Sequence, residues 1–161
     1  MITKKVCVVG DFSVGKTSLT RRFVENIFSE KYQTTVGVKI DTKEVALEHG
    51  NVKLVIWDLA GEEKLAATAK TYLKMSQGLI LVVDGTRQET FESAQRIFLE
   101  LPLPKPPTAF LVNKADLIEE WEITESEIRL FSESFNFMLY TSAKNGENVE
   151  TAFRQLAELM V

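Results

Sequence analysis

The sequence predicts an α/β domain in which a mostly parallel sheet carries helices on both faces. Short β-rich segments alternate with amphipathic helical segments along the 161 residues, an order typical of parallel sheets. Two strand segments, residues 79–83 and 109–112, are continuously apolar, as expected where a sheet is covered on both sides. In such sheets ligands bind beyond the carboxyl ends of the strands, so the residues that follow each strand are the first candidates for function.

Three strands and one helix are expected in the first part of the chain. Residues 6–9 form a short apolar run typical of a buried strand, and a helix is expected over residues 16–26. Residues 37–47 and 52–57 are expected to pair as a hairpin, because the Glu-His-Gly-Asn segment between them has the composition of a turn.

The second part of the chain predicts further strands at 79–83, 109–112 and 137–140. A capping box at Thr124–Glu127 predicts the start of a helix there. Apolar side chains recur at helical spacing in three segments, as on the buried face of a helix. They are Phe91, Ala94, Ile97 and Phe98 in residues 89–99, then Ile128, Phe131 and Phe135, and finally Val149, Ala152, Phe153, Leu156 and Leu159 in residues 147–160.

Composition excludes several classes of protein. The chain has 19 basic and 23 acidic residues, and this mild acidity argues against a general nucleic-acid binder. The single cysteine, Cys7, lies in the apolar run 6–9, which favours a buried, inert thiol in a reducing compartment over a catalytic one. No apolar run approaches the length that a bilayer requires, and neither end carries a lipidation signal. We therefore expect a cytoplasmic protein without a direct membrane anchor in this chain.

The first strand is followed by a segment that matches the phosphate-binding motif G-x-x-x-x-G-K-[ST] over Gly10–Thr17. Its glycines let the backbone bend so that several N–H groups converge on phosphate, and the helix that follows directs its positive end there. Lys16 is expected to reach the β- and γ-phosphates, and the Thr17 hydroxyl to bind Mg²⁺. The expected nucleotide contacts here are Asp11, Phe12, Ser13, Val14, Gly15, Lys16, Thr17 and Ser18. The loop alone does not distinguish ATP from GTP.

Two later segments predict a metal ligand and a guanine contact. Asp58 ends a strand and is followed by Gly61, so Asp58 is expected in the Mg²⁺ shell and the Gly61 N–H at the γ-phosphate. The Asn113-Lys114-Ala115-Asp116 segment follows the 109–112 strand. A carboxylate such as Asp116 accepts from both the N1–H and the amino group of guanine, whereas adenine offers no such pair of donors. The stem of Lys114 is expected to lie on the base.

The last expected strand is followed by Ser142, Ala143 and Lys144, where the Ala143 N–H is placed to donate to guanine O6. Taken with the other motifs in the same order, this chain resembles the Ras superfamily of small GTPases, most closely its Rab-type branch. The resemblance covers nearly the whole chain. It implies a P-loop NTPase G domain over residues 1–161, with a six-stranded sheet, GTP or GDP bound with Mg²⁺, and two switch segments.

The resemblance also assigns roles in the segments 28–40 and 59–73, through which effectors, exchange factors and GTPase-activating proteins are expected to bind. Phe28 matches the aromatic residue that packs on guanine, and Tyr32 the tyrosine that closes over the phosphates. Thr35 matches the threonine that contacts Mg²⁺ and the γ-phosphate. The metal set is therefore Thr17, Thr35 and Asp58. Rab-type proteins usually have an aromatic residue where this chain has Ile40, so their surface triad with Trp57 and Tyr72 is incomplete here.

Two departures from the family pattern concern hydrolysis. Glu62 stands where the family has glutamine, and an ionised carboxylate only accepts hydrogen bonds and adds negative charge near the γ-phosphate. Phe12 occupies a position that the family keeps small. The expected catalytic residues are Glu62, Lys16, Thr35 and Gly61. The first hypothesis is a switch that binds GTP and hydrolyses it slowly; the alternative is a GTP-bound interaction module that hardly turns over because of Glu62 and Phe12.

Overall fold

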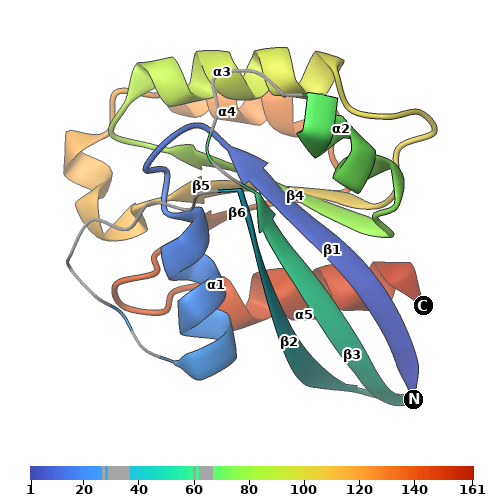
Figure 1. Cartoon of the computed structure of the whole chain (residues 1–161). Helices are drawn as coiled ribbons and strands as arrows, with labels where there is room; N and C mark the ends of the chain where they lie inside the picture. Colours follow the sequence, from blue (N-terminus) through green and yellow to red (C-terminus); the bar gives the residue numbers. More distant parts are fainter. Residues whose placement is uncertain (27, 29–36, 60, 62–66) are drawn as a thin grey trace.

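The computed structural model contains one six-stranded sheet with helices on both of its faces (Figure 1). The structure describes residues 1–26, 28, 37–59, 61 and 67–161. The strands are β1 (Ile2–Gly10), β2 (Val38–Leu47), β3 (Gly50–Leu59), β4 (Gly78–Asp84), β5 (Thr108–Asn113) and β6 (Phe137–Thr141). The helices are α1 (Lys16–Glu25), α2 (Ala67–Lys74), α3 (Gln88–Leu99), the short 3₁₀ helix η1 (Ala115–Glu120), α4 (Glu125–Ser132) and α5 (Val149–Met160).

The sheet is mostly parallel, as the alternation of strands and helices predicts. The strand order is β2-β3-β1-β4-β5-β6, and only the β2–β3 pair is antiparallel. That hairpin has a tighter turn than expected, because Leu47 pairs directly with Gly50. Gly50, the first residue of β3, has a φ of 132°, a conformation that favours glycine at the point where the chain leaves the turn.

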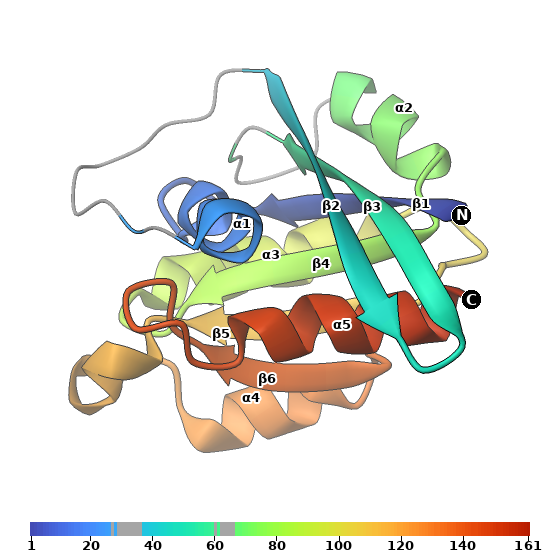
Figure 2. The same ribbon diagram turned by 90° about the horizontal axis from the view of Figure 1, so that it is seen from below.

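Residues alternate between two core layers along the central strands. In β1, Val6 and Val8 belong to the layer beneath α1 and α5, whereas Cys7 and Val9 belong to the opposite layer. Figure 2 shows α1 and α5 together on the first of these faces. Phe23 of α1 stacks on Phe153 of α5 with ring centroids 4.1 Å apart, which joins the two helices above the sheet.

The opposite layer, under α2, α3 and α4, is rich in aromatic rings. Phe110 of β5 contacts both Phe131 and Phe135 at ring-centroid distances of 5.0 and 5.2 Å. The expected capping box at Thr124 is present, but α4 ends at Ser132. Phe135 therefore lies in the following turn and still occupies the apolar face predicted for it.

One expected core residue points outward. Leu159 is 45% exposed, and Met160 is buried in its place. Gly78 at the start of β4 explains the exchange, because a Cβ there would lie 2.5 Å from the Met160 sulfur. The missing side chain leaves room for Met160, so the apolar stripe of α5 ends one residue later than its spacing predicts. Two elements, α2 and η1, were not predicted.

The carboxyl ends of β1, β3, β4, β5 and β6 meet at one edge of the sheet, since these strands run in the same direction. The phosphate loop and the segments after β3, β5 and β6 all begin at this edge. In the part of the chain that the structure describes, no helix has the length and apolar character needed to cross a membrane.

Candidate functional site

The phosphate loop, Gly10–Thr17, connects β1 to α1 at the carboxyl edge of the sheet. Gly15 has a φ of 99°, and a Cβ on it would lie 2.2 Å from the Asn113 side-chain nitrogen. Both the backbone conformation and the available space therefore require glycine. Lys16 is buried, and its Nζ donates to the Asp11 carbonyl at 3.4 Å across the loop. The lysine is thus held along the loop that a nucleotide's phosphates would occupy.

Asn113 at the end of β5 joins the phosphate loop to the segments on the other side of the edge. Its Nδ2 donates to the Val14 carbonyl at 2.9 Å, and its Oδ1 accepts from the Thr141 hydroxyl at 3.1 Å. Asn113 is itself buried. A single amide therefore links the phosphate loop, β5 and β6, which is why the close approach at Gly15 is needed.

Two oxygen groups meet where Mg²⁺ is expected. The Thr17 hydroxyl donates to Asp58 Oδ2 at 2.5 Å, and Asp58 is fully buried at the end of β3. Magnesium prefers carboxylate and hydroxyl oxygens near phosphate, so this pair has suitable chemistry for the ion. Thr35, the third expected ligand, lies outside the described residues, as do Tyr32 and Glu62.

Gly61 packs directly on the phosphate loop. A Cβ at this position would lie 2.8 Å from the Phe12 Cα and 2.9 Å from the Asp11 carbonyl oxygen. Since these neighbours are backbone atoms, no side chain fits. The structure therefore brings the backbone of residue 61 against the loop, close to the place where the sequence predicts a γ-phosphate contact.

The residues expected to read guanine are brought together by contacts between the segments after β5 and β6. The Ser142 hydroxyl donates to Asp116 Oδ1 at 2.8 Å and fixes that exposed carboxylate. Ser142 and Ala143 are buried, whereas Lys144 is exposed. Lys114 has a φ of 72°, and its Nζ lies 2.7 Å from Asp84 Oδ2. The ion pair ties the Lys114 side chain to the end of β4.

Asp11 makes contacts that its place in the motif does not predict. Its carboxylate accepts from the Phe12 N–H and from the Ser93 hydroxyl, both at 2.6 Å, and Arg96 donates to the same hydroxyl at 3.1 Å. The Asp11 side chain is thus tied to α3.

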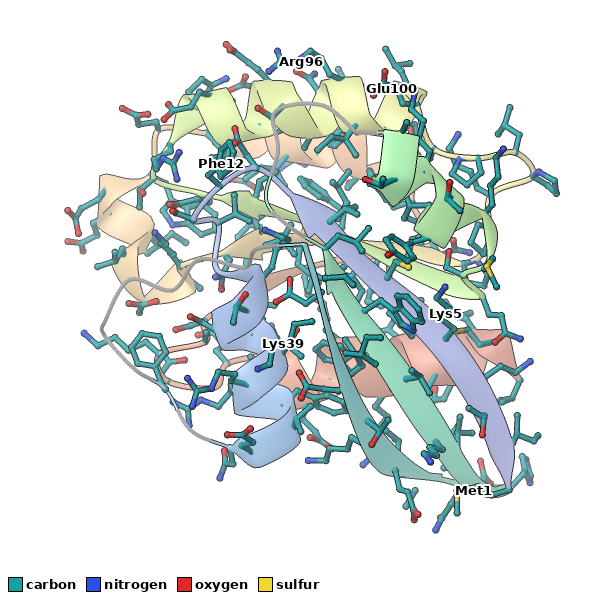
Figure 3. The ribbon with its side chains drawn as sticks, viewed as in Figure 1. Met1, Lys5, Phe12, Lys39, Arg96 and Glu100 are labelled. Atoms are coloured by element: carbon teal, nitrogen blue, oxygen red, sulfur yellow. The ribbon has the colours of Figure 1, made fainter. Side chains whose placement is uncertain are left out.

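Phe12 is 50% exposed at the tip of the loop (Figure 3). Ser18 lies in the first turns of α1.

Phe28 is partly buried and packs against the core layer that contains Phe23. Its expected contact with guanine stays a prediction.

Several residues that sequence reasoning did not single out hold the site together. Asp84 is fully buried at the end of β4, and its place directly after an apolar strand is a signal that would have found it. Arg87 donates to the Phe12 carbonyl at 3.0 Å. Arg22 of α1 donates through Nε to the Ala143 carbonyl at 2.8 Å and through Nη2 to the Lys144 carbonyl. No sequence signal marks Arg22 or Arg87, because their partners lie far along the chain.

A second surface lies over β1, β3 and the end of α2. The rings of Trp57 and Tyr72 are 5.1 Å apart, and Lys5 Nζ lies 3.8 Å from the Trp57 ring centroid. Ile40, which pairs with Trp57 across the hairpin, is 49% exposed. The aromatic pair is therefore present, and a lysine covers it.

Cys7 is fully buried in β1, as expected of an inert thiol. Burial raises the pKa of this thiol to about 11, although Lys5 and a hydrogen bond with Ser76 lower it. The group therefore stays protonated at neutral pH and takes no part in nucleophilic chemistry.

Comparisons with known proteins agree with these features. Residues 5–161 match the Ras family. The chain is 36% identical over 157 residues to the Ras-related protein Rab-22A of Homo sapiens, an alignment that covers 95% of this chain and 81% of that protein. It is 35% identical to RABA4a of Arabidopsis thaliana over 92% of this chain and 68% of that protein. It is 34% identical to Rab-1 of Theileria parva over 97% of this chain and 73% of that protein.

Proposed function

The chain belongs to the Ras family of small GTPases, in its Rab-like branch, and from this premise we propose that residues 1–161 form a single G domain that works as a GTP/GDP switch. The observation that carries the proposal is the bond from Asn113 to the Val14 carbonyl at 2.9 Å. It joins the phosphate loop to the guanine-reading segment in one cross-linked site. One nucleotide would occupy both halves of that site.

The phosphate half would be held by the backbone N–H groups of residues 13–17 and by Lys16. Thr17 and Asp58 would hold Mg²⁺, with Thr35 as a further ligand; when bound, the ion neutralises charge on the phosphates. The contact between Thr17 and Asp58 at 2.5 Å supports this assignment, since it already places a hydroxyl and a carboxylate together.

The base half would select guanine. Asp116, oriented by Ser142, would accept from the N1–H and the 2-amino group, and the Ala143 N–H would donate to O6. Adenine would leave the carboxylate without donors, which disfavours it strongly. Phe28 and the stem of Lys114 would cover the two faces of the base.

Hydrolysis would proceed by attack of water on the γ-phosphate, which breaks the bond between the γ-phosphorus and the bridging oxygen and releases GDP and phosphate. We assign Glu62 to orient that water by accepting a hydrogen bond from it, with Lys16 and the N–H of Gly61 stabilising the charge that develops on the phosphate oxygens. Thr35 would contact the γ-phosphate oxygens as well. Because a carboxylate does not donate, Glu62 would supply less stabilisation than a glutamine, so slow hydrolysis is expected.

Loss of the γ-phosphate would remove the partner of Thr35 and Gly61, and so change the segments 28–40 and 59–73. We propose that effectors, exchange factors and activating proteins bind through these segments. The exposed Ile40 and the ring of Tyr72 lie within these segments, and Trp57, which packs on Tyr72, lies just before the second of them. The single buried Cys7 fits a reducing, cytoplasmic location.

The test of the catalytic assignment is single-turnover conversion of bound GTP to GDP with Mg²⁺, in wild type and Glu62→Gln. We expect slow hydrolysis by wild type and a rate changed at least several-fold by the substitution, because the substitution removes a charge beside the γ-phosphate. The rate of nucleotide release should be the same in both proteins.

Glu63→Gln is the matched control, since it removes an equal charge at the next position, and its rate should equal that of wild type. Equal rates in wild type and Glu62→Gln would remove Glu62 from the chemistry. GTP that stays intact for hours in wild type would contradict unassisted hydrolysis as a whole.

A further inference from the structure

We propose that Trp121 is a positioning residue for guanine selectivity, which it controls by fixing the turn that carries Lys114 and Asp116. The proposal rests on the proposed function, because it concerns the guanine half of that site. Trp121 directly follows η1. Its indole N–H binds the backbone of the turn that carries the expected base-reading side chains, and its ring packs on Gly85 and Tyr140.

The indole N–H is the first of these contacts. Trp121 Nε1 donates to the Lys114 carbonyl at 2.8 Å, and the same carbonyl accepts from the Leu117 N–H at 2.9 Å. Lys114 has a φ of 72°, a conformation that is costly for a residue with a side chain. Two donors on one carbonyl thus hold a turn that would otherwise relax, and Asp116 lies within that turn.

The indole ring is the second contact. It lies against Gly85, where a Cβ would approach the ring to 2.3 Å, and it packs edge-on against Tyr140 with centroids 4.9 Å apart. The backbone N–H groups of Glu122 and Ile123 donate to the Gly85 carbonyl at 2.9 and 3.2 Å. The ring is therefore locked between the ends of β4 and β6.

These contacts involve the backbone beside both partners of the Asp84–Lys114 ion pair. Gly85, under the ring, is the neighbour of Asp84, and the indole N–H binds the backbone of Lys114. Moving the ring would shift Lys114 and the turn after it relative to Ser142, which orients Asp116. Such a shift would weaken the hydrogen bonds from guanine N1–H and the 2-amino group, because their geometry depends on the position of the Asp116 carboxylate.

The test compares the affinities for GDP and inosine diphosphate, which lacks only the 2-amino group, in nucleotide-free protein. Trp121→Phe keeps a ring and removes the N–H. Gly85→Ala displaces the ring from its other side and leaves Trp121 intact. In both variants we expect GDP affinity to fall about 3- to 10-fold, the effect of weakening one hydrogen bond. The affinity for inosine diphosphate should fall less, because this nucleotide has no 2-amino group to lose a hydrogen bond. The ratio of GDP affinity to inosine diphosphate affinity should therefore decrease.

Phe98→Leu is the control, since it removes a ring from the aromatic layer near Phe131, at the end of α3 away from the site. It should lower thermal stability and leave the GDP preference unchanged. Equal losses for both nucleotides in Trp121→Phe and Gly85→Ala would reduce Trp121 to a structural role and overturn the proposal. A wild type that binds GDP no better than ADP would instead overturn the proposed function, so the two failures are distinguishable.

Discussion

At the scale of single residues, Arg22 joins the two halves of the site. It lies on the helix that begins at Lys16, and its guanidinium binds the carbonyls of Ala143 and Lys144 on the guanine side. Charged donors to backbone carbonyls form stronger hydrogen bonds than neutral ones. The arginine therefore holds the segment whose N–H is assigned to guanine O6.

We predict that Arg22→Met releases GDP roughly tenfold faster than wild type, since about 1.5 kcal/mol of charge-assisted hydrogen bonding is lost. The measurement is displacement of a fluorescent GDP analogue by excess GDP in Mg²⁺ buffer. Arg21→Met is the control, because Arg21 lies on the same helix and pairs with Glu25 on its surface, at 3.7 Å. Equal release rates for the two variants would show that the hydrogen bonds from Arg22 to the Ala143 and Lys144 carbonyls do not slow nucleotide release.

Sequence reasoning at this scale proposes residues that would touch a ligand and misses residues that hold them in place. Lys16, Thr17, Asp58 and Asp116 lie in motifs at the ends of strands, where the rule for parallel sheets places function. Arg22 looks like any arginine on a helix surface, because its partners are 121 and 122 residues away. Such contacts exist only once the sheet has brought the segments together.

At the scale of elements, the sequence predicts strands and helices correctly where their apolar pattern is strong, and it misses elements without such a pattern. The fully buried strands β4 and β5 were located to within one residue at each end, since nothing polar interrupts them. The helix η1 has no buried residue, so no apolar face marks it in the sequence. The predicted end of α5 at Met160 is correct, but the expected burial of Leu159 is wrong, because Gly78, on another element, leaves room for the Met160 side chain in the core.

The capping box of α4 provides a prediction about stability. The Thr124 hydroxyl accepts from the Glu127 N–H at 3.2 Å, and the Glu127 carboxylate accepts from the Thr124 N–H at 3.1 Å. We expect Thr124→Ala to lower the free energy of unfolding by about 1 kcal/mol. Urea unfolding of the GDP-bound wild type and variant measures this difference in free energy. Ser126→Ala, at an uncapped position of the same turn, should cost much less.

The contribution of Glu127 to this cap should depend on pH. The hydrogen bond from the Thr124 N–H, and then that from Gln88, lower the pKa of Glu127. A lowered pKa in the folded state stabilises the fold above the pKa of the unfolded chain, about 4.3, and this contribution is lost as pH falls through the folded value. The difference in the free energy of unfolding between wild type and Glu127→Ala should therefore shrink in acid. A difference that stays constant with pH would mean that the charge of Glu127 adds nothing to the cap.

At the scale of the whole molecule, nucleotide binding and stability are linked. A ligand that binds only the folded state stabilises it by about 2.7 kcal/mol at one hundred times its Kd. For a chain of this size each 1 kcal/mol raises Tm by roughly 2–4 °C. We therefore expect GDP with Mg²⁺ to raise the Tm of nucleotide-free protein by about 5–10 °C, and ADP to leave it unchanged.

In Asp116→Ala, GDP should no longer raise the Tm, because the carboxylate assigned to read the base is missing. The Tm of the nucleotide-free variant should equal that of wild type, because Asp116 is exposed and its removal opens no cavity. Asp41→Ala, which removes an acidic side chain paired with Lys39 on β2, should keep the full response. A GDP response that survives in Asp116→Ala would show that another group reads the base.

The central strand β4 lies between β1 and β5, and every one of its seven residues is buried. Its amide hydrogens have no path to water through the fraying of an edge or the movement of a loop, so they exchange with solvent only when the whole domain opens. The proposed nucleotide site, in contrast, consists of segments that begin where the strands end. Local movement of those segments does not require the sheet to open, so nucleotide would be exchanged within the folded state even though binding raises the stability of that state.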